Sequence, residues 1–155
     1  MTLDLRVYLV PDSASAASGG RSVVDVVAAA VRGGVTTVQV REKDSSARAF
    51  LDTVERVAAV LPSHVALLVN DRVDVYLAAR DRGVRVSGVH VGQSDLPLEA
   101  VRRLVGPEAI VGLSAATAAE LAQAEAVGGV DYVGVGAVHS TQTKSDAPPA
   151  IGVDG

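Results

Sequence analysis

The chain has 155 residues, a formal net charge of −4 and no cysteine. This length suits one domain with its own core, while the missing cysteines exclude disulfides, zinc–thiolate sites and thiol nucleophiles. The acidic balance argues against general nucleic-acid binding, and no apolar run approaches the roughly 18 residues of a membrane span. Because the first residues also lack the features of a secretory signal, we expect a single cytoplasmic domain over residues 1–155.

Six short apolar segments are typical of strands buried on both faces, as in parallel sheets. They lie at residues 5–10, 36–41, 65–69, 88–91, 110–114 and 132–135. Helical patterns fill the intervals at residues 23–32, 46–61, 73–82, 98–104 and 117–127. Residues 11–21, rich in Ser, Ala and Gly, are predicted to form a flexible loop.

A faint internal repeat supports this division of the chain. GGVTTVQV at 33–40, GVRVSGVHV at 83–91 and GGVDYVGV at 128–135 each join a glycine helix stop to a strand. The even strand spacing predicts an α/β fold of the TIM (β/α) barrel type rather than a doubly wound sheet. Such barrels have eight βα units and about 200 to 250 residues, so only about six of the eight units are expected here. The chain is expected to be either a fragment or a shortened relative.

Two acids follow neighbouring predicted strands. Asp71 comes just after the third strand and Asp95 shortly after the fourth, so both should lie at the carboxyl edge of the sheet. Two adjacent carboxylates with open coordination positions suit Mg²⁺, whose other positions are filled by phosphates and waters. The competing interpretation is local: Asn70 and Asp71 would cap the next helix, and Asp95 would begin a turn before Pro97.

Basic and hydroxyl groups follow other strands. Gln39 and Arg41 share one side of the second strand, Lys43 follows them, and Ser114 ends the fifth strand. After the sixth strand come Thr141, Thr143 and Lys144, a combination that suits a phosphate but is also common on plain solvated surface. We interpret His90 and His139 as structural. Together these groups predict a diphosphate site at the barrel mouth.

The motifs VQVREK at 38–43, VNDR at 69–72, GVHVGQSDLP at 88–97, GLS at 112–114, DYVGVG at 131–136 and TQTK at 141–144 occur in one order. In that order and spacing the chain resembles the thiamine-phosphate synthase family over nearly its whole length. The resemblance implies a TIM barrel that uses Mg²⁺ to join hydroxymethylpyrimidine diphosphate to thiazole phosphate. The products would be thiamine phosphate and diphosphate, so the expected partners are small-molecule substrates rather than nucleic acid or membrane.

Matching motif positions also implies residue roles. The resemblance assigns the diphosphate to Gln39, Arg41, Lys43, Asn70 and Lys144. It assigns Mg²⁺ to Asp71 and Asp95, the pyrimidine substrate to Ser114, and the thiazole phosphate to Thr141 and Thr143. Arg41, Lys43 and Lys144 are the expected catalytic residues, because they stabilise negative charge on the departing diphosphate. One departure is Ala116, where the family often has a histidine.

Two alternatives remain at the level of the sequence. A thiazole tautomerase, a related barrel, is expected to carry a histidine near Ala137 and to lack the paired acids, so Ala137, Asp71 and Asp95 argue against it. A fragment that binds a phosphate ligand without catalysis is compatible with the missing barrel units.

Overall fold

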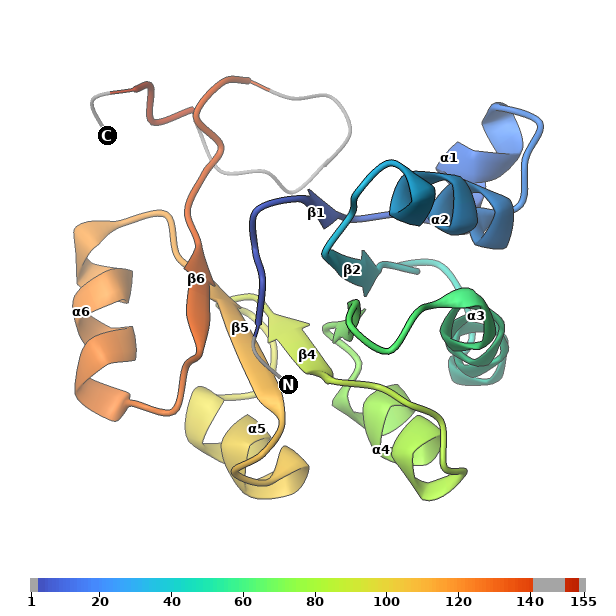
Figure 1. Ribbon diagram of the computed structural model, residues 1–155. Helices are drawn as coiled ribbons and strands as arrows, with labels where there is room; N and C mark the ends of the chain where they lie inside the picture. The colour runs from blue at the N-terminus through green and yellow to red at the C-terminus, as the bar shows by residue number, and fades with distance from the viewer. Residues whose placement is uncertain (1–2, 141–149, 154–155) are drawn as a thin grey trace.

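The computed structural model describes residues 3–140 and 150–153 (Figure 1). All strands are parallel and lie in the sheet in chain order. The strands are β1 (Tyr8–Leu9), β2 (Thr37–Val40), β3 (Ala66–Asn70), β4 (Gly88–Val91), β5 (Ile110–Ser114) and β6 (Tyr132–Gly134). The helices are α1 (Ser13–Ser18), α2 (Val23–Arg32), α3 (Ala47–Val60), α4 (Val73–Asp81), α5 (Leu98–Val105) and α6 (Ala118–Val127).

The helices cover the outer face of the curved sheet (Figure 1). Phe50, Val54 and Val57 of α3 are fully buried, as are Leu67 and Val69 of β3. This packing follows from the sequence because apolar positions of α3 recur at helical spacing and β3 is apolar along almost its whole length. The expected α/β architecture of the TIM-barrel type, with six strands of the barrel present, is confirmed.

Hydrogen bonds between polar side chains inside the curved sheet connect β1 to β6. The hydroxyls of Tyr8 in β1 and Tyr132 in β6 lie 2.5 Å apart, and the Gln39 amide donates to Tyr8 at 2.6 Å. On the other side, His90 Nδ1 lies 2.8 Å from the Tyr132 hydroxyl, and His90 Nε2 lies 3.0 Å from the Ser114 hydroxyl. Side chains therefore connect five strands across the interior, although no ladder pairs β1 with β6 among the described residues.

The prediction of a loop over residues 11–21 is wrong, because α1 lies within it. The Asp12 side chain caps this helix by accepting a hydrogen bond from the Ser15 backbone at 2.7 Å. An Asp cap followed by alanines is enough for one short helix, whereas the Ser and Gly content of the segment had suggested none. In the described part of the chain, no helix is long and apolar enough to cross a membrane.

Candidate functional site

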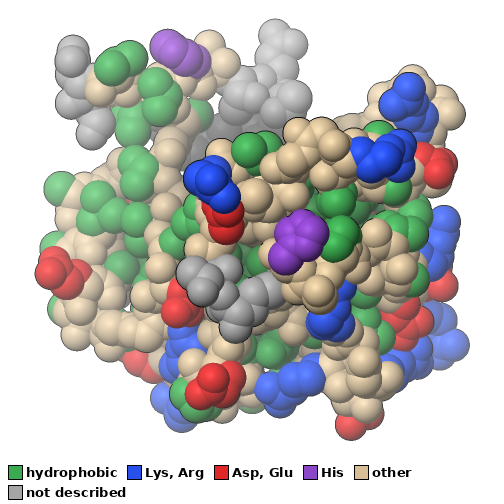
Figure 2. Space-filling model, viewed as in Figure 1, with side chains coloured by type: hydrophobic (Ala, Val, Ile, Leu, Met, Phe, Trp, Pro, Cys, Tyr) green, Lys and Arg blue, Asp and Glu red, His purple; other side chains and the backbone are tan. Residues whose placement is uncertain are grey.

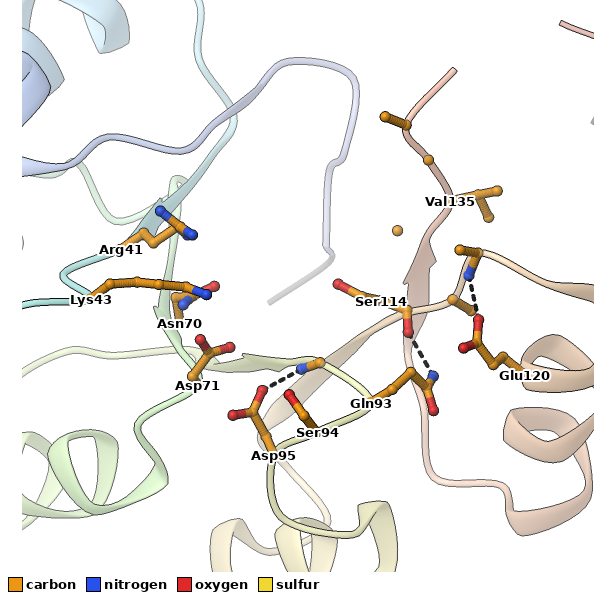
Figure 3. Close-up of a pocket in the computed structure, with 16 residues that line it drawn as sticks. Arg41, Lys43, Asn70, Asp71, Gln93, Ser94, Asp95, Ser114, Glu120 and Val135 are labelled. Atoms are coloured by element: carbon orange, nitrogen blue, oxygen red, sulfur yellow. Dashed lines mark hydrogen bonds between the residues drawn. The ribbon is translucent and has the colours of Figure 1, made fainter. Parts of the chain in front are cut away.

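A pocket of about 530 Å³ lies at the carboxyl ends of the strands (Figure 3). Parallel strands bring their carboxyl ends to one edge, which is where barrels of this kind place their sites. Polar and charged side chains supply much of its wall. These are Arg41, Lys43, Asn70, Asp71, Gln93, Ser94, Asp95, Ser114 and Glu120.

Asp71 directly follows β3, and the backbone turns sharply at this residue. Its backbone N–H donates to the His90 carbonyl at 2.8 Å, yet its φ is 59°, in the left-handed region that side chains other than glycine rarely adopt. The residue before α4 is Arg72, and no side chain caps that helix. The capping interpretation of Asn70 and Asp71 is therefore wrong, and a strained backbone at this edge is typical of functional positions.

Asp95 lies beside Asp71 in the pocket (Figure 3) and has a structural role as well. Its Oδ2 accepts a hydrogen bond from the Gly92 backbone at 2.7 Å, which fixes the turn after β4 (Figure 3). Asp95 thus closes the turn over residues 92–95 instead of beginning a turn before Pro97. Because its carboxylate also lines the pocket, the same side chain remains available to a ligand.

The two carboxylates influence each other. Partial burial, followed by the nearby charge of Asp95, raises the pKa of Asp71, which reaches about 6 instead of the usual 3.8. The Lys43 ammonium and a hydrogen bond from Asn70 oppose that rise. A carboxyl with a raised pKa beside a second carboxyl gains from a cation that neutralises both, so the site is prepared for a positive charge.

The donor set fits a magnesium ion that is shared with a phosphate. Asp71 and Asp95 offer only oxygen ligands, and no group of three or more His, Cys, Asp or Glu side chains in the described chain could hold a metal. Mg²⁺ prefers oxygen and is often held by one or two carboxylates plus waters and substrate phosphates. A site that needs phosphate oxygens to complete the coordination is therefore suited to Mg²⁺ and less suited to zinc.

Arg41, Lys43 and Asn70 form the wall beside the acids. All three line the pocket and come from the ends of β2 and β3 (Figure 3). Guanidinium forks and ammonium groups bind phosphate oxygens, and an amide can add a neutral donor. The structure therefore brings two cations and two carboxylates of the predicted site into one pocket.

The other predicted residues are distributed differently. Ser114 lines the pocket and contacts His90, and its carbonyl accepts from Gln93 at 2.7 Å. Gln39 is buried against Tyr8 and is not among the side chains that line the pocket. Thr141, Thr143 and Lys144 lie outside the described residues.

Several residues at or near the pocket were not predicted. Glu120, in the first turn of α6, lines the pocket wall, and its carboxylate accepts hydrogen bonds from the Ala116 and Thr117 backbones at 2.6 and 3.0 Å. The Thr117 and Glu120 spacing is a capping box that the sequence could have revealed. Tyr8 and Tyr132 were missed too, although strand alternation places Tyr8 on an inward position.

Comparisons with known proteins identify the family. The chain matches the family described as thiamine monophosphate synthase over residues 7–155. It is 45% identical to a thiamine-phosphate synthase of Albidiferax ferrireducens over 152 residues, which cover 97% of this chain and 66% of the relative. It is also 45% identical to the Corynebacterium efficiens enzyme of that name, covering 99% of this chain and 70% of the relative.

A solved structure has the same fold. Thiamine phosphate pyrophosphorylase from Pyrococcus furiosus superposes with a TM-score of 0.80 at 30% identity, covering 97% of this chain and 67% of that one. The chain thus spans about two thirds of the length of these relatives. With a family match over nearly every residue and a shared barrel architecture, this chain belongs to the thiamine monophosphate synthase family.

Proposed function

We propose that the whole protein joins hydroxymethylpyrimidine diphosphate to thiazole phosphate, giving thiamine phosphate and diphosphate. One observation carries the proposal: Arg41 and Lys43 line the same pocket as Asp71 and Asp95. That combination suits a diphosphate with its metal ion, and the relatives that carry the synthase name support the choice of substrates.

The reaction breaks the bond between the pyrimidine methylene carbon and the diphosphate oxygen. The bonding electrons leave with the diphosphate, and the thiazole nitrogen then supplies the pair that forms the new carbon–nitrogen bond. Arg41 and Lys43 would hold the diphosphate and stabilise the charge that grows on its oxygens. Asp71 and Asp95 would hold Mg²⁺, which supplies further positive charge to the leaving group.

No protein nucleophile is required in this scheme, because the thiazole nitrogen is the attacking atom. Ser114, on the opposite wall of the pocket, would contact the pyrimidine diphosphate. We assign the thiazole phosphate to Thr141 and Thr143 and a further diphosphate contact to Lys144, on the strength of the family motif alone. Gln39 would act from the interior behind the pocket.

The pocket composition also bears on the tautomerase alternative. Ala137 lines the pocket where a tautomerase would be expected to carry an imidazole, so an acid–base group is lacking at that position. The two acids have no evident use in a tautomerisation that involves no leaving diphosphate. Both observations favour the synthase.

The test is a coupling assay on the whole protein with both substrates and Mg²⁺. We expect thiamine phosphate to form only when all three are present. A protein that binds Mg²⁺ and diphosphate but never yields product would support the non-catalytic alternative, and product formation without a divalent metal would contradict the roles given to Asp71 and Asp95.

A further inference from the structure

Glu42 is an acid between the two pocket cations, but it faces away from them. Among residues 3–140 and 150–153 it is the only buried acidic side chain, with 9% of its surface exposed. Arg41 and Lys43 on either side line the pocket, while Glu42 does not. Burial of a carboxylate is costly unless hydrogen bonds compensate, so its presence needs an explanation.

The Glu42 carboxylate connects two loops. Its Oε1 accepts a hydrogen bond from the Ser13 backbone at 2.9 Å and another from the Ser13 hydroxyl at 2.5 Å. Its Oε2 accepts from the Ser45 hydroxyl at 3.3 Å. One side chain therefore joins the start of α1 to the loop between β2 and α3.

The backbone next to Glu42 is also hydrogen-bonded to the segment that follows β1. The Arg41 N–H donates to the Pro11 carbonyl at 3.0 Å, just beyond the short pairing of β1 with β2. With Pro11 bonded to Arg41 and Ser13 bonded to Glu42, the segment after β1 is attached to two consecutive residues of the β2–α3 loop. These contacts hold the backbone at the point where the chain leaves the sheet between Arg41 and Lys43.

We propose that Glu42 is a positioning residue for diphosphate binding: its contacts with Ser13 and Ser45 hold Arg41 and Lys43 toward Asp71 and Asp95. The inference rests on the proposed function, since it assumes that these cations bind the diphosphate. Groups that grip a ligand must be held close to their productive geometry by supporting hydrogen bonds. The role is distinct from catalysis because Glu42 does not line the pocket.

The test compares Glu42→Ala with a matched control in the whole protein. Asp131 is suited to be the control, because its carboxylate accepts from the Val111 backbone at 2.7 Å and from Arg102 at 2.8 Å, at the opposite end of the sheet. Calorimetry would measure the affinity for inorganic diphosphate in the presence of Mg²⁺, and steady-state assays would measure KM for each substrate. Thermal melting would follow stability in both variants.

We expect Glu42→Ala to weaken diphosphate binding about tenfold or more, since small misplacements of gripping groups have large effects. KM for the pyrimidine diphosphate should rise while KM for the thiazole phosphate stays nearly constant. Asp131→Ala should lower the melting temperature without changing either KM. Glu42→Gln, which keeps an oxygen acceptor for Ser13, should restore most of the affinity.

Ser13→Ala provides a second variant if Glu42→Ala does not fold. It removes one hydroxyl from a partly exposed position and keeps the backbone donor. We therefore expect KM for the pyrimidine diphosphate to rise, but by less than in Glu42→Ala. Unchanged diphosphate affinity in these variants, or equal losses for both substrates, would overturn the inference. A wild-type protein that does not bind diphosphate would instead contradict the proposed function.

Discussion

The two sides of the pocket are built on unequal parts of the sheet. Strands β2, β3 and β4 are buried along their whole length, and Arg41, Asn70 and Asp71 lie at or just beyond the ends of β2 and β3. Strand β6 is mostly exposed, and β1 is only half-buried. The charged groups that must be held most accurately therefore stand on the best-packed strands.

The surface shows the same difference. Charged side chains gather around α3, α4 and α5, while the side of α6 and β6 is mostly apolar or uncharged (Figure 2). Leu121, Val127, Val133 and Val135 on that second side each expose more than a third of their surface. Within the described residues, Arg41, Asn70 and Asp71 therefore stand in or next to fully buried strands, whereas the pocket residues near β6 stand next to a strand with exposed side chains.

Two strand glycines give the largest expected contrast in stability. A methyl group on Gly88 of β4 would lie 1.8 Å from the Ile110 carbonyl oxygen, whereas one on Gly134 of β6 would lie 3.4 Å from the His90 ring. We expect Gly88→Ala to cost about 3 kcal/mol or more, or to prevent folding. Gly134→Ala should change the free energy of unfolding by less than about 1 kcal/mol. Denaturant unfolding measures both, and equal losses would contradict the comparison.

Variants of Asp71 and Asp95 should lose activity but keep the fold. Asp71→Asn and Asp95→Asn each remove one charge from the proposed Mg²⁺ site, so we expect Mg²⁺-dependent coupling to fall by about a hundredfold or more. Asp71→Asn also relieves repulsion between the carboxylates, so its melting temperature should not fall. Steady-state kinetics and thermal melting check the two statements. Near-wild-type turnover in either variant would refute the metal assignment.

Arg41→Lys sharpens the assignment of the basic wall. The substitution keeps the charge but loses the two-pronged contact with phosphate oxygens. We expect KM for the pyrimidine diphosphate to rise about tenfold, which corresponds to roughly 1.4 kcal/mol of binding. KM for the thiazole phosphate should change much less. Equal changes for both substrates would place Arg41 elsewhere in the mechanism.

The smallest expected effect is a pH dependence of the free energy of unfolding, measured without divalent metal. Burial and the charge of Asp95 raise the pKa of Asp71 to about 6 in the folded chain, above the ordinary value of 3.8 that applies when the chain is unfolded. Between these values the folded state binds more protons, so the free energy of unfolding should fall as the pH rises from about 4 to about 6. Melting curves of wild type and Asp71→Asn would test this. The same slope in both would show that Asp71 is not its source.

The sequence predicted β2 to β6 to within one residue at each end because their cause is local, whereas β1 is only Tyr8–Leu9 instead of the expected residues 5–10. Buried runs such as Gly88–Val91 and Ile110–Ser114 have the bounds that their apolar pattern indicates. The pocket residues Arg41, Asp71 and Asp95 were found because parallel topology brings strand ends together regardless of detail.

What the sequence could not reveal depends on contacts between distant segments. The link from Glu42 to Ser13 joins two loops that no periodic pattern connects, and the Tyr8–Tyr132 contact spans almost the entire described chain. The left-handed backbone of Asp71 was also unforeseen, because a non-glycine residue rarely adopts that conformation without tertiary support.

In the proposed function, Asp71 and Asp95 bind diphosphate through Mg²⁺ beside Arg41 and Lys43. Calorimetric titration of inorganic diphosphate into the whole protein, with and without Mg²⁺, tests it most directly, with the double variant Asp71→Asn, Asp95→Asn as the comparison. We expect tight binding only for the wild type with Mg²⁺, and weak binding through the cations in the other three conditions. Diphosphate binding of equal strength in all four conditions would contradict the roles of Asp71, Asp95 and Mg²⁺.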